Sequence, residues 1–156
     1  MLLVIVLLAG CDEAVFKVKQ NLNYGTLAAV EACVKRNESE LVTLDIIRNQ
    51  CVATHEGPFP MLPTGKAAFR PFRYFSGTIE NPTQTHILTT LGIRVTFFDA
   101  NSIDDEMHTV RGLWIMPGES GDFYISPAEF AREGDLSDEN WRWRIAVSRG
   151  IKIDVH

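Results

Sequence analysis

The residue types best suited to metal binding or acid–base chemistry occur in one acidic stretch and in four scattered histidines. The stretch Asp104-Asp105-Glu106 precedes His108, and its oxygen atoms could hold a cation. It lacks the Asp-x-Asp-x-Asp-Gly spacing of a calcium loop. No pair of histidines has metal-ligand spacing along the sequence: His55, His86, His108 and His156. We therefore predict a solvated hairpin loop over 104–106, with no metal site.

Ser120 is the candidate nucleophile. It lies in Gly118-Glu119-Ser120-Gly121, which is similar to the Gly-Asp-Ser-Gly segment of trypsin-like proteases. A nucleophilic serine needs a histidine base and an orienting carboxylate. Neither His55 nor His86 has the Ala-Ala-His-Cys context of that family, and Pro117 with Gly118 favours a turn. We predict an exposed turn over 117–119, no catalytic residue and no cofactor.

Aromatic and basic side chains interleave in two segments, 69–75 and 141–144. Such surfaces are enriched at protein interfaces and can also stack on glycans or bases. On strands, however, alternate side chains face the core and the solvent, which explains the same pattern without a ligand. Both interpretations stay open here. The candidate binding surface consists of Phe72, Arg73, Tyr74, Trp141, Arg142 and Trp143.

The overall composition of the chain is typical of a globular protein. It has 156 residues, 46% of them hydrophobic, with 15 Lys+Arg against 20 Asp+Glu and a net charge of −5. The length suits one domain, or a small domain with an appendage. A mildly acidic chain is a poor candidate for a nucleic-acid binder, because contact with a phosphate backbone needs a basic surface.

The first residues resemble the signal peptide and lipobox of bacterial lipoproteins. An apolar run over 1–9 leads into Leu8-Ala9-Gly10-Cys11, and it is too short to span a bilayer. The resemblance implies that Cys11 is lipidated and that 1–10 is removed. Asp12 is similar to the signal that retains such proteins in the inner membrane, facing the periplasm. No basic residue precedes the run, which departs from the usual pattern.

With Cys11 lipidated, Cys33 and Cys51 remain as an even pair in an oxidising compartment. They lie 51 − 33 = 18 positions apart in a helical stretch, which on one helix is about 27 Å. A disulfide requires Cα atoms within about 7 Å. A helix break near Asn37, which could cap a second helix, therefore predicts a helical hairpin over 26–54 that is closed by a disulfide. Redox catalysis and metal binding are the alternatives for this pair.

Three further segments are predicted. Residues 11–25 form a tether before the helical hairpin, 55–66 form a Pro/Gly-rich linker after it, and 67–156 form a β domain. An edge strand is expected near 69–75. Alternation predicts that four side chains of one strand face the core, whereas Arg94 and Thr96 face away. The four are Leu91, Ile93, Val95 and Phe97.

Further strands are expected over 110–116, 121–125, 141–147 and 150–155. Trp114 is predicted to join the core through the first of these. Phe98 shares the face of Arg94 and Thr96, yet it is too apolar to prefer full exposure. We expect the helical hairpin or the linker to cover it.

Three segments of the predicted β domain resemble the FxLyD-type module, an immunoglobulin-like β-sandwich of exported bacterial and archaeal proteins. They are Gly77–Asn81, Ile93–Asp99, and Met116–Ser120 with Phe123 after it. The match covers about 70–126, roughly a third of the chain. The short strands and their turns predict a sandwich or barrel, and with the helical hairpin an α+β chain. The resemblance implies an immunoglobulin-like antiparallel sandwich and an envelope setting, and it brings no catalytic residues.

Together these features predict a membrane-anchored bacterial envelope lipoprotein that acts as a non-enzymatic binding or structural module. Its partners would be the membrane, through lipid on Cys11, and an envelope protein. The alternative is a small envelope hydrolase with an unrecognised site.

Overall fold

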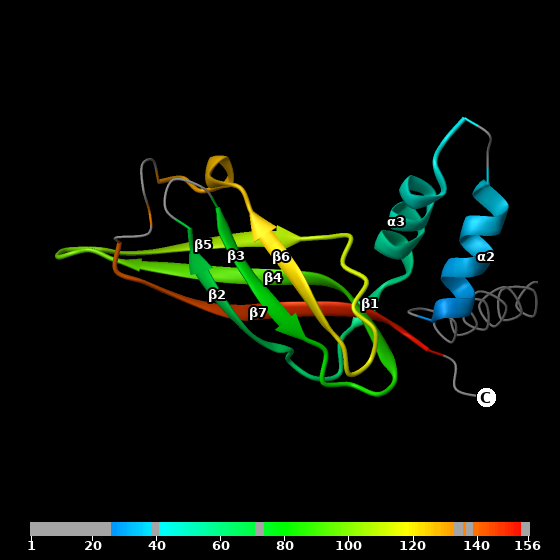
Figure 1. The fold of residues 1–156 in the computed structure, drawn as a ribbon. Coiled ribbons are helices and arrows are strands. Elements are labelled where there is room, and N and C mark those ends of the chain that lie inside the picture. The colour runs from blue at the N-terminus through cyan, green and yellow to red at the C-terminus, as the bar shows by residue number, and fades with distance from the viewer. Residues whose placement is uncertain (1–25, 39–40, 71–73, 133–135, 137–138, 154–156) are drawn as a thin grey trace, which may run out of the picture.

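The computed structural model describes residues 26–38, 41–70, 74–132, 136 and 139–153. Two helices precede two antiparallel sheets, so the fold is α+β (Figure 1). The helices are α2 (Leu27–Asn37) and α3 (Leu44–His55). One sheet contains β1 (Gly57–Pro58), β7 (Trp141–Lys152), β4 (His86–Phe98) and β5 (Ile103–Val110), in that order. The other contains β2 (Thr64–Phe69), β3 (Phe75–Glu80) and β6 (Ser120–Ile125).

The predicted helical hairpin and its disulfide are confirmed. Cys33 and Cys51 are bonded, with their Cα atoms 5.7 Å apart. Asn37 does not cap the second helix, because it is the last residue of α2 and its side-chain amide donates to the Cys33 carbonyl. Thr43 is the N-cap residue of α3 instead. Neither helix is long enough to cross a bilayer.

The hairpin packs on one end of the four-stranded sheet. Val30, Ile47 and Val52 form a small apolar cluster with the disulfide, Ile87 of β4 and Ile151 of β7. A bridge between Thr26 and Lys152 and the short β1–β7 ladder hold both ends of the hairpin beside β7. A buried carboxylate, Glu56, reinforces this joint, since it accepts from the hydroxyls of Thr89 and Thr90 at 2.8 Å and meets Arg149 Nε at 3.2 Å.

Phe98 lies at the far end of β4 from the hairpin, so the prediction that the hairpin or the linker covers it is wrong. The Arg142 guanidinium lies over its ring instead, 5.5 Å from the centroid. The long β4–β7 pairing decides this outcome. It places Ile87 opposite Ile151, near the helices, and Phe97 opposite Trp141 at the other end (Figure 1).

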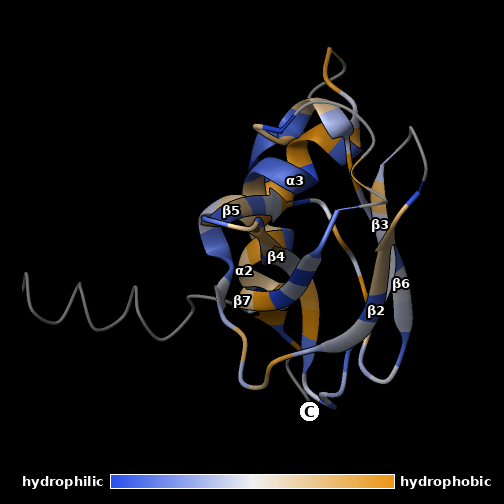
Figure 2. Ribbon diagram, turned by 90° about the vertical axis from the view of Figure 1, so that its left-hand side faces the viewer, coloured by the Kyte–Doolittle hydropathy of each residue, from blue (hydrophilic) through white to orange (hydrophobic). Residues whose placement is uncertain are grey.

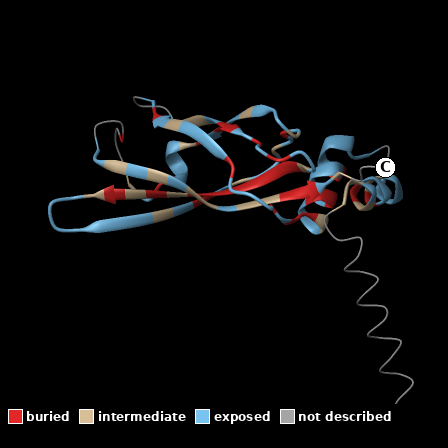
Figure 3. Cartoon of the chain, turned by 90° about the horizontal axis from the view of Figure 1, so that it is seen from below, coloured by how far each residue is buried: buried red, intermediate tan, exposed pale blue. Residues whose placement is uncertain are grey.

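The main core lies between the two sheets (Figures 2 and 3). The alternation predicted for β4 is confirmed: Leu91, Ile93, Val95 and Phe97 are fully buried. Arg94 and Thr96 face away, and both side chains contact Asp105 of β5. Aromatic rings dominate the part of the core near η1 (Pro127–Glu129), a short 3-10 turn that Ser126 caps.

Several predicted boundaries differ from the structure. The acidic stretch 104–106 is not a loop, because it lies within β5. The predicted strand over 110–116 is absent from the described chain, and Trp114 is 41% exposed beside Arg48 rather than in the core. Residues after Trp141 form one strand to Lys152, with register shifts, rather than two.

The acidic residues are tolerated in β5 because it is an edge strand and each carboxylate has a partner. Asp104 pairs with Arg132 and Asp105 with Arg94, while Glu106 accepts from the Ala131 N–H at 3.0 Å and lies 3.4 Å from His108 Nε2. The predicted edge strand near 69–75 is instead divided between two strands: β2 ends at Phe69, opposite the first residue of β3, Phe75, and the Arg70 N–H donates to the Tyr74 carbonyl. The linker predicted over 55–66 contains β1 and the first residues of β2. The turn over 117–119 is present, with Gly118 at φ +74°.

Candidate binding site

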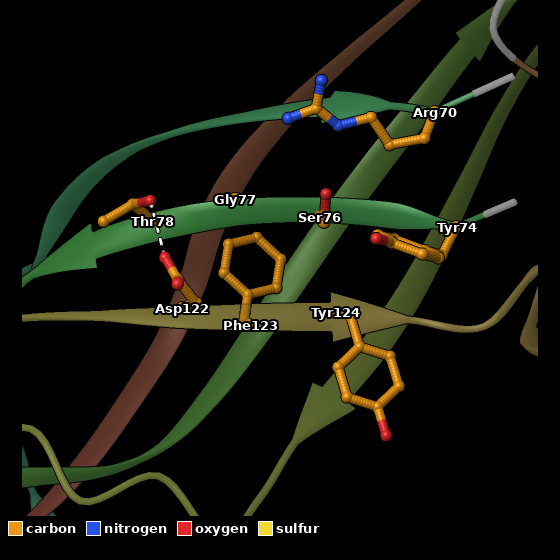
Figure 4. Close-up of a pocket in the computed structure, with 8 residues that line it drawn as sticks. All are labelled: Arg70, Tyr74, Ser76, Gly77, Thr78, Asp122, Phe123 and Tyr124. Atoms are coloured by element: carbon orange, nitrogen blue, oxygen red, sulfur yellow. Dashed lines mark hydrogen bonds between the residues drawn. The ribbon is translucent and has the colours of Figure 1, made fainter.

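The outer face of the three-stranded sheet presents a group of polar and aromatic side chains. Along β3 and β6 the buried residues alternate with solvent-facing ones, because successive side chains of a strand point to opposite faces. The solvent-facing side includes Ser76 and Thr78 of β3, and Asp122 and Tyr124 of β6 (Figure 4). Sheet pairing sets Ser76 opposite Tyr124 and Thr78 opposite Asp122. The inward residues fix this register, since a slip by one position would expose the core.

The β2–β3 hairpin adds two side chains that frame the site. Tyr74 and Tyr124 are 40% and 72% exposed, and their rings meet edge to face at 6.3 Å between centroids. The Arg70 side chain runs along β2, on the side of β3 that is away from β6 (Figure 4). The Thr78 hydroxyl donates to Asp122 Oδ1 at 2.8 Å. Together the side chains line an open depression of about 520 Å³.

This arrangement can bind but has few means to react. The two rings offer apolar stacking area, and Arg70 offers several donors. Asp122 keeps a second carboxylate oxygen for a ligand donor after its bond to Thr78. The charges of Arg70 and Asp122 have opposite signs, so the site favours a ligand with both donors and acceptors beside an apolar surface. We name this surface the tyrosine face.

The residues predicted as one binding surface are not brought together. Trp141 and Trp143 turn inward, with ring centroids 5.8 and 6.1 Å from that of Phe75. Arg142 is exposed on the opposite sheet. Of the predicted residues that the structure describes, Tyr74 alone belongs to the tyrosine face. Phe72, Arg73 and Cys11 lie outside the described residues. The sequence analysis missed Ser76, Thr78, Asp122 and Tyr124, although the alternation of Asp122-Phe123-Tyr124-Ile125 carried the signal for β6.

The other polar clusters are explained by packing. Asp104, Glu106 and His108 share the core-side face of β5, and no group of three metal-binding side chains occurs within the described ranges. Arg132 spans the edge of this strand, with Nη2 at 2.7 Å from Asp99 and 2.6 Å from Asp104. The hydrogen bond between Arg132 and Asp99 favours the charged form of both side chains. It lowers the pKa of Asp99 below its ordinary value and raises the pKa of Arg132. These contacts fasten the segment after η1 to β4 and β5.

His108 is expected to make stability fall in mild acid. Its ring is buried, 4.2 Å from that of Phe130, and this burial lowers its pKa even though Glu106 and Glu129 oppose the effect. The unfolded chain therefore takes up this proton at a higher pH than the folded chain. The free energy of unfolding should decline as pH falls below about 6.5, the ordinary histidine value, and level off below the folded pKa.

Urea unfolding of the wild type and of His108→Gln between about pH 7.5 and 5 tests this expectation. The variant should show the shallower pH slope. Some slope should persist, because burial and Lys152 also lower the pKa of His86. Equal slopes in the two proteins would contradict the assignment to His108.

No family model, no curated protein and no solved structure matches this chain.

Proposed function

We propose that this chain is a non-enzymatic binding module of the bacterial envelope, held at a membrane by lipid on Cys11, which engages an envelope protein through the tyrosine face. In this proposal 1–10 is a lipoprotein signal peptide, and the two facing sheets are an immunoglobulin-like, FxLyD-like sandwich. Asp12 assigns it to the inner membrane, facing the periplasm.

The disulfide supports the envelope setting. Bonds of this kind persist in oxidising compartments and are rare in the cytosol. Cys33 and Cys51 form such a bond, and the remaining cysteine, Cys11, is the one in the lipobox-like segment.

The observation that carries the binding role is the tyrosine face itself. Exposed tyrosines and arginines are the residue types that contribute most of the energy at protein interfaces. Here Tyr74, Tyr124 and Arg70 line the same depression as the hydrogen-bonded pair Thr78–Asp122, on paired strands. Ordered strands present these groups with little freedom left to lose, which lowers the entropic cost of binding.

Site-specific photo-crosslinking in the producing cell tests the tyrosine face. The full chain would carry a photoreactive phenylalanine in place of Tyr124, and a matched control would carry it in place of Met61, which is also exposed but lies outside the face. We expect a discrete adduct from position 124 that position 61 does not give. Adding Tyr74→Ala should weaken the adduct about tenfold or more, in line with the loss of an interface anchor. Absence of an adduct at 124, or identical adducts from both positions, would overturn the proposed face.

Mass spectrometry of the membrane-extracted chain tests the anchor separately. We expect the chain to begin at Cys11 with acyl groups attached. An intact Met1 with a free Cys11 thiol would contradict the anchor without bearing on the crosslinking result.

A further inference from the structure

The outer face of the four-stranded sheet differs in character from the tyrosine face and lies on the other side of the molecule (Figure 2). Strand alternation turns Arg94 of β4 and Arg142 and Arg144 of β7 to this side, opposite to the buried Val95 and the partly buried Trp143. The register sets Arg94 directly across from Arg144, and Thr96 across from Arg142. Three guanidinium groups therefore lie on two neighbouring strands, and we name this surface the arginine face.

The arginine face carries uncompensated positive charge on an acidic chain. Like charges directly opposite each other on paired strands are destabilising, so Arg94 and Arg144 cost the fold some stability. Asp105 pairs with Arg94 at 3.5 Å. Within the described ranges no ion pair involves Arg142 or Arg144, whereas the whole chain has a net charge of −5. An anionic partner would relieve this repulsion.

Apolar side chains flank the arginines on the same face. Val147 and Met107 converge over Gly92, where an added Cβ would lie 3.1 Å from Val147 Cβ and 3.4 Å from Met107 Cε. Ile103 lies opposite Phe98 at the other end of the strands and is 69% exposed. Val147 and Met107 are about half exposed. Apolar groups on a basic surface are the combination that inserts among lipid headgroups and attracts anionic lipids.

We propose that the arginine face lies on an anionic phospholipid surface. The proposal rests on the membrane anchoring proposed above, which keeps this face near a bilayer. Cys11 and Thr26 are 26 − 11 = 15 positions apart, and a chain of that length reaches at most about 50 Å. That reach lets the sheet lie flat beside its anchor, while the tyrosine face on the other sheet stays open to a protein partner. The favoured source of negative charge is the lipid headgroup rather than an acidic protein, because the exposed apolar side chains of Val147, Met107 and Ile103 flank the arginines.

Arginine-directed chemical modification tests this arrangement on the full chain. The protein would be reconstituted in phosphatidylcholine vesicles with and without phosphatidylglycerol, treated with phenylglyoxal and mapped by mass spectrometry. We expect phosphatidylglycerol to slow the modification of Arg142 and Arg144 about fivefold or more, the equivalent of one favourable arginine–surface contact. Arg70, on the opposite sheet, should react equally in both vesicles. High salt should remove the protection, because exposed charges are screened.

Two double variants with reversed charges test whether the effect of phosphatidylglycerol depends on the arginine face. Arg142→Glu with Arg144→Glu should abolish the effect of phosphatidylglycerol. The pair Lys66→Glu and Arg36→Glu changes the net charge equally but lies on the other sheet and on α2, so it should retain the effect. Circular dichroism and the intact disulfide would show that each variant is folded.

The outcomes separate this proposal from the anchor. Equal modification of Arg142 and Arg144 in both vesicles overturns the proposal, and this would also be the result if an acidic protein were the true partner. Flotation with neutral vesicles reports the anchor alone. The chain could instead fail to float with neutral vesicles and float with anionic ones, while the anionic vesicles protect Arg142 and Arg144 from phenylglyoxal. That result would contradict the anchor and support the arginine face.

Discussion

Replacing Cys51 by alanine is expected to lower the free energy of unfolding by about 3 kcal/mol, within a range of about 2–5 kcal/mol. The bond to Cys33 closes a loop between residues 18 positions apart, and its loss lets the unfolded chain expand. The sulfur also lies in the small apolar cluster that joins the hairpin to β4 and β7, and Cys51 is buried there. The joint therefore loses both a covalent link and packing. Urea unfolding followed by circular dichroism measures the change.

Matched variants show which part of the effect belongs to the bond. Cys33→Ala alone, and Cys33→Ala together with Cys51→Ala, should each cost about as much as Cys51→Ala, because either change removes the same disulfide. Reduction of the wild-type protein should move its unfolding midpoint toward that of the variants. A double variant as stable as the wild type would contradict a stabilising role for the bond.

Replacing Phe75 by alanine is expected to cost about 3–5 kcal/mol, the usual range for removing a buried aromatic ring. Phe75 is fully buried on β3, and its ring meets five others at centroid distances from 4.8 to 6.4 Å. Those rings come from both sheets and from the segment after η1, and they belong to Phe69, Phe123, Phe130, Trp141 and Trp143. The cavity would therefore weaken the contact between the sheets as a whole. Because domains are stable by only about 5–15 kcal/mol, the variant should be close to its unfolding threshold.

Tyr124→Ala is the control for Phe75→Ala. Tyr124 lies on the neighbouring strand and is 72% exposed, so its truncation should change stability by less than about 1 kcal/mol. The tryptophan fluorescence and near-ultraviolet circular dichroism of Phe75→Ala should also change, because Trp141 and Trp143 lose a neighbouring ring. Equal stability of the two variants would contradict the placement of Phe75 in the core.

Local patterns in the sequence were sufficient for several elements. The alternation from Leu91 to Phe97 specified a strand and its buried face, because side chains in strands repeat every two residues. The helix formers, the break after α2 and the spacing of Cys33 and Cys51 together specified the hairpin and its bond. These inferences needed only residues that are close in sequence, or a distance limit between two of them.

The sequence by itself thus determined the α+β order of elements, the core face of β4 and the helical hairpin. Only the tertiary structure decided which aromatic residues meet. The tyrosine face joins Tyr74 and Tyr124, which are 124 − 74 = 50 positions apart, while Trp141 and Trp143 turn into the core. It also made the acidic stretch a strand, since Arg132 and Arg94 compensate the charges of Asp104 and Asp105, and Glu106 accepts a hydrogen bond from the Ala131 N–H. Pairing between distant strands sets each face and each partner, and a short window of sequence contains no information on that pairing.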